Sequence, residues 1–245
     1  MASDHTRTVR SGHTLMAESG PWAGVVEELD QKGFAVTRRP LLSERDAAAL
    51  RRGFDRDADF RNTVEMARHN FGQGRYRYYA NPVPSVIANL RAVAYGQLVG
   101  LANEWSSRLG EEPFPGSIDD FVESCATRGQ TQPTPLILRY GVGGWNALHQ
   151  DLYGEVYFPF QMAVALSRPG ADFSGGENLF VLQRPRSQSR GSAVAVPYRH
   201  GVVFATNHLP ILGTRGYYRA VMRHGVSTVT SGERTVLGII FHNAS

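Results

Sequence analysis

The chain has 245 residues, of which 42% are hydrophobic and 20% charged, as is ordinary for a globular protein. It contains no apolar run long enough to span a membrane, and its one cysteine, Cys125, excludes an internal disulfide and a multi-cysteine zinc site. The formal charge of +4 permits contact with nucleic acid without requiring it, and the cysteine usage favours a cytoplasmic protein.

The N-terminal 20 residues are polar and lack the apolar segment of a secretory signal, so we expect a mobile tail there. The next stretch, PWAGVVEELDQKG, predicts a helix that ends at Gly33. GFAVTRRPLL then predicts a short strand, and Ser43 is the expected N-cap of a helix over ERDAAALRRGFD. The tail is therefore followed by alternating helical and extended segments.

A long helix is predicted over PSVIANLRAVAYGQLVGLANEWSSRLG, and IDDFVESCATR predicts a shorter one. The long helix carries its apolar side chains at the spacing of a single buried face. These residues are Ile87, Leu90, Ala94, Leu98, Leu101 and Trp105.

From Leu136 onward, β-branched and aromatic runs alternate with Gly and Pro, which is typical of short strands in a barrel or sandwich. We expect one α+β domain over residues 21–245, with a helical part at 21–133 and a β-rich part at 134–245. The seven candidate strands are LILRYGVG, VYFPFQMAVALS, ENLFVLQ, SAVAVPY, GVVFATN, YRAVMRHGVSTV and RTVLGIIFH.

Three residues of the β-rich part have the chemistry of a metal site. His149 and Asp151 are two residues apart, so on an extended segment both side chains point to one face. His224, on a late candidate strand, can supply a third ligand. Two histidines and one carboxylate on one face of an octahedron leave three positions open, which is the arrangement of non-haem Fe(II) oxygenases.

Arg234 begins the strand after His224 and can form a two-pronged pair with a carboxylate of a bound acid. Each residue taken alone also has an ordinary structural explanation. His224 can be a hydrogen-bonded histidine of a sheet, and Arg234 can form a surface ion pair. His208 is a rival third ligand because Arg219 follows it at a similar distance. We reject His208 because NHLPILGTRGYY, with its Pro and Gly residues, predicts a loop.

The stretch from Thr134 to His242 resembles the 2-oxoglutarate/Fe(II)-dependent dioxygenase superfamily, above all its prolyl-hydroxylase-like branch. Three segments carry the resemblance: LRYGVGGWNALHQD, FSGGENLFV and RHGVSTVTSGERTVLGIIFH. GFAVTRRPLLSERDAAALRRGFD is similar to the N-terminal strand and helix of such enzymes. The resemblance implies a double-stranded β-helix, or jelly roll, whose core is buttressed by the N-terminal helices.

The resemblance also implies roles for individual residues. His149, Asp151 and His224 would bind Fe(II), and Arg234 would pair with the C5 carboxylate of 2-oxoglutarate. Tyr140 matches a position that often hydrogen-bonds this cosubstrate, although a core tyrosine explains it equally well. O₂ would convert the cosubstrate to succinate and CO₂ while a substrate C–H bond is hydroxylated.

The combination of motifs resembles a bacterial family assigned, through relatedness to AlkB-type repair dioxygenases, to oxidative demethylation of damaged DNA. In GRYRYYANP, Arg75 and Arg77 interleave with Tyr76, Tyr78 and Tyr79, as a stacking surface with phosphate contacts would require. A half-buried strand with an arginine-rich face gives the same pattern. Trp145, on the way into the metal triplet, could stack on an extruded base or simply pack its loop.

Two other functions fit the sequence. One is hydroxylation of a small metabolite or a protein side chain, which suits the prolyl-hydroxylase-like motifs. The other is a catalytically inactive binding module that keeps the fold. The complete set of metal ligands argues against the inactive module, because loss of one ligand is enough to abolish activity.

Overall fold

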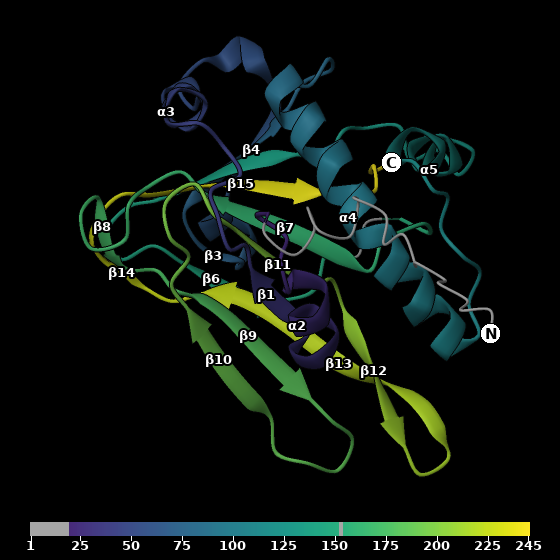
Figure 1. Ribbon diagram of the computed structural model, residues 1–245. Coiled ribbons are helices and arrows are strands. Elements are labelled where there is room, and N and C mark those ends of the chain that lie inside the picture. Colours follow the sequence, from purple (N-terminus) through teal and green to yellow (C-terminus); the bar gives the residue numbers. More distant parts are fainter. Residues whose placement is uncertain (1–19, 152–153) are drawn as a thin grey trace, which may run out of the picture.

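The computed structural model describes residues 20–151 and 154–245, so the predicted tail at 1–20 lies almost wholly outside the described part (Figure 1). No helix among the described residues has the length and apolar character needed to cross a membrane. The helices are α2 (Val25–Lys32), α3 (Glu44–Gly53), α4 (Ser85–Leu109) and α5 (Ile118–Ala126), with two short 3-10 turns, η1 (Asp57–Asp59) and η2 (Met66–His69).

The described strands form three antiparallel sheets. A seven-stranded sheet has the order β1 (Phe34–Val36), β11 (Gly201–Ala205), β7 (Phe160–Ala165), β15 (Arg234–Ile240), β5 (Leu136–Tyr140), β4 (Arg75–Tyr79), β2 (Phe60–Glu65). A six-stranded sheet has β10 (Arg190–Val194), β9 (Asn178–Gln183), β13 (Gly216–Val226), β6 (Trp145–His149) and β3 (Gly72–Gln73), with β12 (His208–Gly213) beside β13. A small third sheet pairs β8 (Phe173–Gly175) with β14 (Val229–Gly232). The predicted α+β class is confirmed.

The predicted helix ends are confirmed by their hydrogen bonds. The hydroxyl of Ser43 accepts from the Asp46 backbone N–H at 3.1 Å and caps α3, since this N–H has no partner inside the helix. Gly33 ends α2 with φ +78°, and its N–H donates to the Leu29 carbonyl at 2.8 Å. Glycine suits this left-handed position because it has no Cβ.

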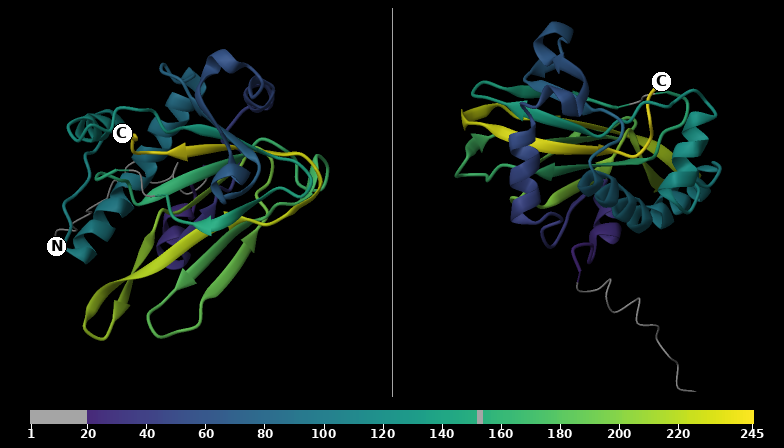
Figure 2. Two further views of the ribbon diagram at one scale, coloured as in Figure 1. Left: turned by 180° about the vertical axis from the view of Figure 1, so that it is seen from behind. Right: turned by 90° about the horizontal axis from the view of Figure 1, so that it is seen from above.

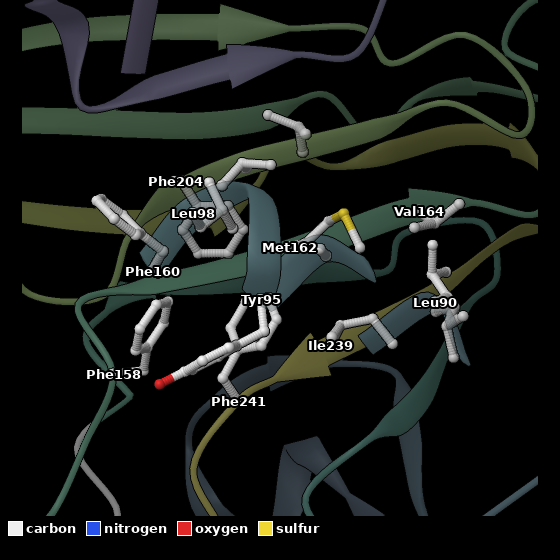
Figure 3. Packing of buried hydrophobic residues seen from close by; sticks show 14 of the residues in the cluster. Leu90, Tyr95, Leu98, Phe158, Phe160, Met162, Val164, Phe204, Ile239 and Phe241 are labelled. Atoms are coloured by element: carbon white, nitrogen blue, oxygen red, sulfur yellow. The ribbon is translucent and has the colours of Figure 1, made fainter. Parts of the chain in front are cut away.

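Helix α4 covers one face of the seven-stranded sheet, and all six residues of its predicted apolar face are buried. Figure 3 shows Leu90, Tyr95 and Leu98 of this helix among side chains of β7 and β15. Aromatic rings of the helix and the sheet are in contact: the ring centre of Trp105 on α4 lies 4.6 Å from that of Phe160 on β7. Burial of such large apolar side chains holds the sheet against the helix.

The central strands of this sheet are buried on both faces, and neighbouring residues face different environments. In β15, Leu237 and Ile239 join the core beneath α4, whereas the residues that alternate with them line a pocket on the other face of the sheet. Strand β5 behaves in the same way, with Ile137 in the core. The pocket-lining residues of the two strands are Leu136, Leu138, Tyr140, Arg234, Val236, Gly238 and Ile240.

Several strands were not predicted. Strands β2 and β3 lie between residues 60 and 73, where the sequence pattern is irregular. In contrast, β4 is the half-buried strand that was one of the two interpretations of GRYRYYANP. The loop expected around His208 is wrong, because residues 208–213 form β12. Pro210 is tolerated there because β12 pairs only with β13 and so is an edge strand, and Gly213 and Gly216 close the hairpin.

Candidate metal centre

Two neighbouring strands of the six-stranded sheet bring the two histidines together. His149 is the last residue of β6 and lies directly opposite His224 of β13, with ring centres 4.2 Å apart. The pairing is irregular just after His224, where the register shifts. Register shifts of this kind change the direction of nearby side chains and are common next to functional sites.

Asp151 follows β6 by two residues and completes the cluster. One of its carboxylate oxygens lies 3.4 Å from Nε2 of His149, and the other lies 3.3 Å from Nε2 of His224. The three ligand atoms lie within 4.8 Å of one another, and no other such group of three occurs among residues 20–151 and 154–245. The predicted triplet is therefore one spatial cluster whose donor atoms suit a divalent transition metal.

The charges within the cluster are coupled. Burial raises the pKa of the Asp151 carboxyl, but hydrogen bonds and charge attraction from the two histidines outweigh this effect and hold its pKa well below the usual value. The pKa of His149 is lowered by burial but raised more by Asp151 and the Ala147 carbonyl, so it lies above the usual value. Burial dominates for His224, whose pKa is lowered.

A hydrogen bond outside the cluster fixes the imidazole of His149. Its Nδ1 lies 2.7 Å from the Ala147 carbonyl oxygen, which can only accept, so Nδ1 carries the proton and Nε2 is directed at Asp151. Metal-binding histidines are commonly oriented by such a second contact. His224 packs against the Phe204 ring, with ring centres 4.6 Å apart, and its buried Nδ1 has no hydrogen-bond partner among the described residues.

The cluster opens into a cavity of about 270 Å³ between the two large sheets. Its walls are mostly apolar, with a few polar side chains that converge near the cluster, which is typical of a small-molecule site. The polar or charged residues are Asn146, Gln150, Gln161, Asn178 and Arg234, besides the cluster itself and three tyrosines, Tyr76, Tyr78 and Tyr140.

Arg234 is a buried cation at the wall of this cavity, only 4% exposed. Its Nη2 donates to Oδ1 of Asn178 at 3.0 Å, and no carboxylate of the described residues lies within 4.0 Å of its guanidinium. Burial lowers the pKa of Arg234, against the opposing effects of Tyr140 and Glu177. A buried charge without a counter-ion is costly, so this guanidinium suits an anionic ligand.

Tyr140 lies directly opposite Arg234 in the pairing of β5 with β15, and the guanidinium carbon lies 5.3 Å from the ring centre. Burial raises the pKa of Tyr140 to about 12, although the nearby Arg234 charge acts to lower it, and the buried hydroxyl has no hydrogen-bond partner among the described residues. The phenol therefore keeps its proton at neutral pH and can donate a hydrogen bond within the cavity.

Strand β4 sends Tyr76 and Tyr78 to the cavity face, whereas Arg75, Arg77 and Tyr79 point to the opposite face. Tyr76 lines the cavity, whereas Arg75 forms an ion pair with Glu65. Arg77 is 8% exposed and donates to the Phe54 carbonyl at 2.6 Å, away from the cavity. The structure therefore brings Tyr76 to the cluster but not the two arginines.

Other predicted residues lie around the site. Trp145 begins β6, is 41% exposed and is not among the cavity-lining residues. His208 is buried on β12 and does not belong to the cluster. Glu177, which precedes the cavity residue Asn178, does not belong to the cluster, and its carboxylate accepts from the Ser227 hydroxyl.

Sequence reasoning missed several cavity residues. Phe71 is 48% exposed, lines the cavity and stacks on His69 with ring centres 5.5 Å apart. Asn178 also lines it. Tyr78, by contrast, belongs to the predicted stacking pattern and lines the cavity together with Tyr76. Phe71 and Asn178 carry no local signal because only strand pairing brings them to the cavity.

Most of the chain matches a known protein family. Residues 74–244 match the Oxygenase-NA family, described as an oxygenase catalysing oxidative methylation of damaged DNA. Two uncharacterized proteins of Mycobacterium tuberculosis, MT2286 and Rv2227 from two strains, are each 49% identical over 165 residues, covering 67% of this chain and 71% of theirs.

Solved structures show a similar fold. A Pseudomonas putida prolyl-4-hydroxylase has a TM-score of 0.53 at 16% identity, covering 91% of this chain and 98% of its own. An oxidoreductase of the 2OG-Fe(II) oxygenase family from Burkholderia pseudomallei has a TM-score of 0.53 at 17% identity, covering 100% of this chain and 99% of its own. A Trichoplax adhaerens prolyl hydroxylase has a TM-score of 0.52 at 12% identity, covering 95% of this chain and 93% of its own. At these identities the likeness concerns the fold alone.

Proposed function

Since this chain is an oxygenase of the Oxygenase-NA family, we propose that it is an Fe(II)- and 2-oxoglutarate-dependent dioxygenase that demethylates alkylated DNA bases. One observation carries the proposal. A cluster of two imidazoles and a carboxylate opens into the same cavity as a buried arginine that has no carboxylate partner among the described residues. The first suits a metal and the second an anionic cosubstrate.

His149, Asp151 and His224 would hold the iron. The donor set fits Fe(II), because neutral imidazole and carboxylate are its usual protein ligands and three ligands leave room for others. The lowered pKa of Asp151 keeps its carboxylate ionised, as metal binding requires. Bound Fe(II) and 2-oxoglutarate would supply the oxidising chemistry together with O₂, one oxygen atom of which enters succinate and the other the hydroxylated substrate, with CO₂ released.

Arg234 would bind the distal carboxylate of 2-oxoglutarate, and Tyr140 would donate a hydrogen bond to the same cosubstrate. Both residues line the cavity on adjacent strands, and Asn178 orients the guanidinium through its side-chain oxygen. An ion pair formed in a buried cavity is stronger than one in water. The buried charge of Arg234 therefore favours a dicarboxylate over a neutral ligand.

The methylated base would enter beside the tyrosines of β4. Burial raises the pKa of Tyr76 to about 12, with smaller effects of Tyr78, Asp151 and Tyr140, so its phenol can donate a hydrogen bond to a base. The rings of Tyr76 and Tyr78 meet edge to face at 5.6 Å. Phe71 and Trp145 lie exposed near the metal strand and offer rings for stacking.

The facing antiparallel sheets suit the double-stranded β-helix predicted for residues 134–245, and we propose that residues 21–245 act as one domain. Hydroxylation of an N-methyl group gives a product that loses formaldehyde, so we propose demethylation as the direction of the reaction. Membership of a family described as acting on damaged DNA supports this substrate.

The proposal predicts that succinate and formaldehyde form together when Fe(II), 2-oxoglutarate, O₂ and a single-stranded oligonucleotide with N-methylated bases are supplied. Unmodified oligonucleotide should give neither product above the slow background. Both products are measured after anaerobic loading with iron. Succinate that forms equally with either strand would point to a metabolite or protein substrate. Absence of succinate in every condition would contradict the dioxygenase itself.

Asn178→Asp is expected to raise the 2-oxoglutarate concentration needed for half-maximal turnover by about tenfold or more. The new carboxylate would stand where the Asn178 oxygen already accepts from Arg234, and so would compete with the cosubstrate. Asn178→Ser is the matched control, because it adds no charge. Equal requirements in the aspartate and serine variants would argue against cosubstrate binding at Arg234.

A further inference from the structure

A long acid-free segment lies in the C-terminal half of the chain. Residues 178–232 contain seven arginines and no aspartate or glutamate, although an even spread of the 22 acids would place about five there. GC-rich codon usage can explain many arginines but not the missing acids. A region of one charge sign attracts ligands of the opposite sign.

Most of these arginines have no internal partner. Arg199 pairs with Glu44, and Arg219 pairs with Glu111. The other five are exposed, and within the described residues none has a carboxylate within 4.0 Å. They are Arg184, Arg186, Arg190, Arg215 and Arg223.

The five cations lie on two hairpins of one sheet, β9–β10 and β12–β13. Strands β9 and β13 are neighbours, and Val221 lies opposite Gln183, so both hairpin tips lie at the same end of the sheet. Figures 1 and 2 show the two hairpins projecting side by side, away from α3 and α5. From Arg215 to Arg223 the strand runs roughly 27 Å, a length of about eight nucleotide steps of a B-form strand.

A small cavity lies towards the tip of the first hairpin and measures about 70 Å³. Four of its nine lining residues are apolar, and its polar lining residues include Lys32, Arg184, Arg190 and Ser192. Lys32 already pairs with Glu28 at 2.7 Å, whereas neither arginine has a carboxylate within 4.0 Å among the described residues. Two arginines without an acidic partner at one hollow suit a phosphate group, which accepts several charge-assisted hydrogen bonds.

We propose that these two hairpins bind the phosphate backbone of the DNA strand whose base is oxidised. The inference deepens the proposed function and rests on it for the choice of DNA. Cations spread over two neighbouring hairpins suit a polymer with many charges. Tyr217, two residues after Arg215, is 41% exposed, although the Arg108 guanidinium carbon lies 5.5 Å from its ring centre. Arg223 directly precedes the metal-site His224 on β13, and because successive strand residues face opposite sides, its exposed side chain lies on the outer face of this sheet.

The test compares two triple variants in binding an unmodified, fluorescently labelled single strand of about 20 nucleotides, longer than the hairpin row requires. The hairpin variant is Arg184→Ala, Arg186→Ala, Arg190→Ala. The control removes the same charge through Arg45→Ala, Arg52→Ala, Arg128→Ala, on or just after α3 and α5. Anisotropy gives the affinity over a series of salt concentrations, and thermal melting checks that each variant folds.

The hairpin variant is expected to bind at least about tenfold more weakly than wild type and to lose about 2 from the slope of log affinity against log salt, because each lost phosphate contact removes about 0.7. The control should keep wild-type affinity to within about twofold. Equal losses in both variants, or none in the hairpin variant, would overturn the assignment. Displacement of the DNA by poly-glutamate at equal charge concentration would also overturn it.

The binding experiment and the demethylation assay can fail independently of each other. Unchanged DNA binding by the hairpin variant, with demethylation still observed in wild type, would refute the surface and leave the enzyme assignment standing. Loss of binding in that variant, with no formaldehyde from any methylated strand in wild type, would support the surface and refute the repair reaction.

Discussion

Replacement of His149, Asp151 or His224 by alanine is expected to lower 2-oxoglutarate turnover by at least about a thousandfold in each case. Each substitution removes one of three clustered donors, and two donors hold a metal poorly. Succinate formation measures the turnover, and metal content after dialysis against Fe(II) or Mn(II) measures the site directly. All three variants should lose bound metal together with activity.

The fold should survive these substitutions, because the three residues lie at the cavity and none belongs to the apolar core beneath α4. His208→Gln is the matched control, since His208 is a buried histidine of the same sheet outside the cluster. This variant should keep its metal and its turnover. Full activity in any of the three alanine variants would remove that residue from the metal site.

Arg234→Ala is expected to raise the 2-oxoglutarate requirement by about two orders of magnitude, equivalent to about 2.7 kcal/mol of lost binding. The maximal rate should change less, because the metal ligands remain in place. Arg234→Lys should fall between wild type and alanine, since lysine keeps the charge but loses the two-pronged geometry. The measurement is initial succinate formation over a range of cosubstrate concentrations.

Stability provides an independent measurement at the same position. Without cosubstrate, Arg234→Ala should not lower the melting temperature much, because it removes a buried charge that has no carboxylate partner in the described part of the chain. Added 2-oxoglutarate should stabilise wild type against heat but not the alanine variant. A variant that is stabilised as strongly as wild type would place the cosubstrate anchor elsewhere.

The parts of the site that could be predicted are those with a local signature. His149 and Asp151 are two residues apart on an extended segment, and this spacing fixes their common face wherever the strand lies. The apolar spacing of α4 likewise determined its buried face correctly, because a regular helix has one period. The family resemblance then implied the role of Arg234, which follows the metal-site His224 by ten residues.

The parts that could not be predicted depend on what lies across the strand. Arg77 and Tyr76 are neighbours in a strand, and their alternation alone does not tell which of them faces the cavity. The Phe54 carbonyl and the Thr63 hydroxyl accept hydrogen bonds from Arg77, and this leaves Tyr76 on the cavity side. Strand β12 was missed because its Pro and Gly residues suit a loop as well as an edge hairpin.

Strand β15 is buried on both faces, so substitutions on its two faces have different effects. Substitutions at Val236 or Ile240 alter the shape of the cavity, whereas those at Leu237 or Ile239 act on the packing against α4. Substrate range and thermal robustness can therefore drift or be engineered independently along one short strand. A library restricted to the cavity-facing positions should yield altered selectivity with few unfolded members.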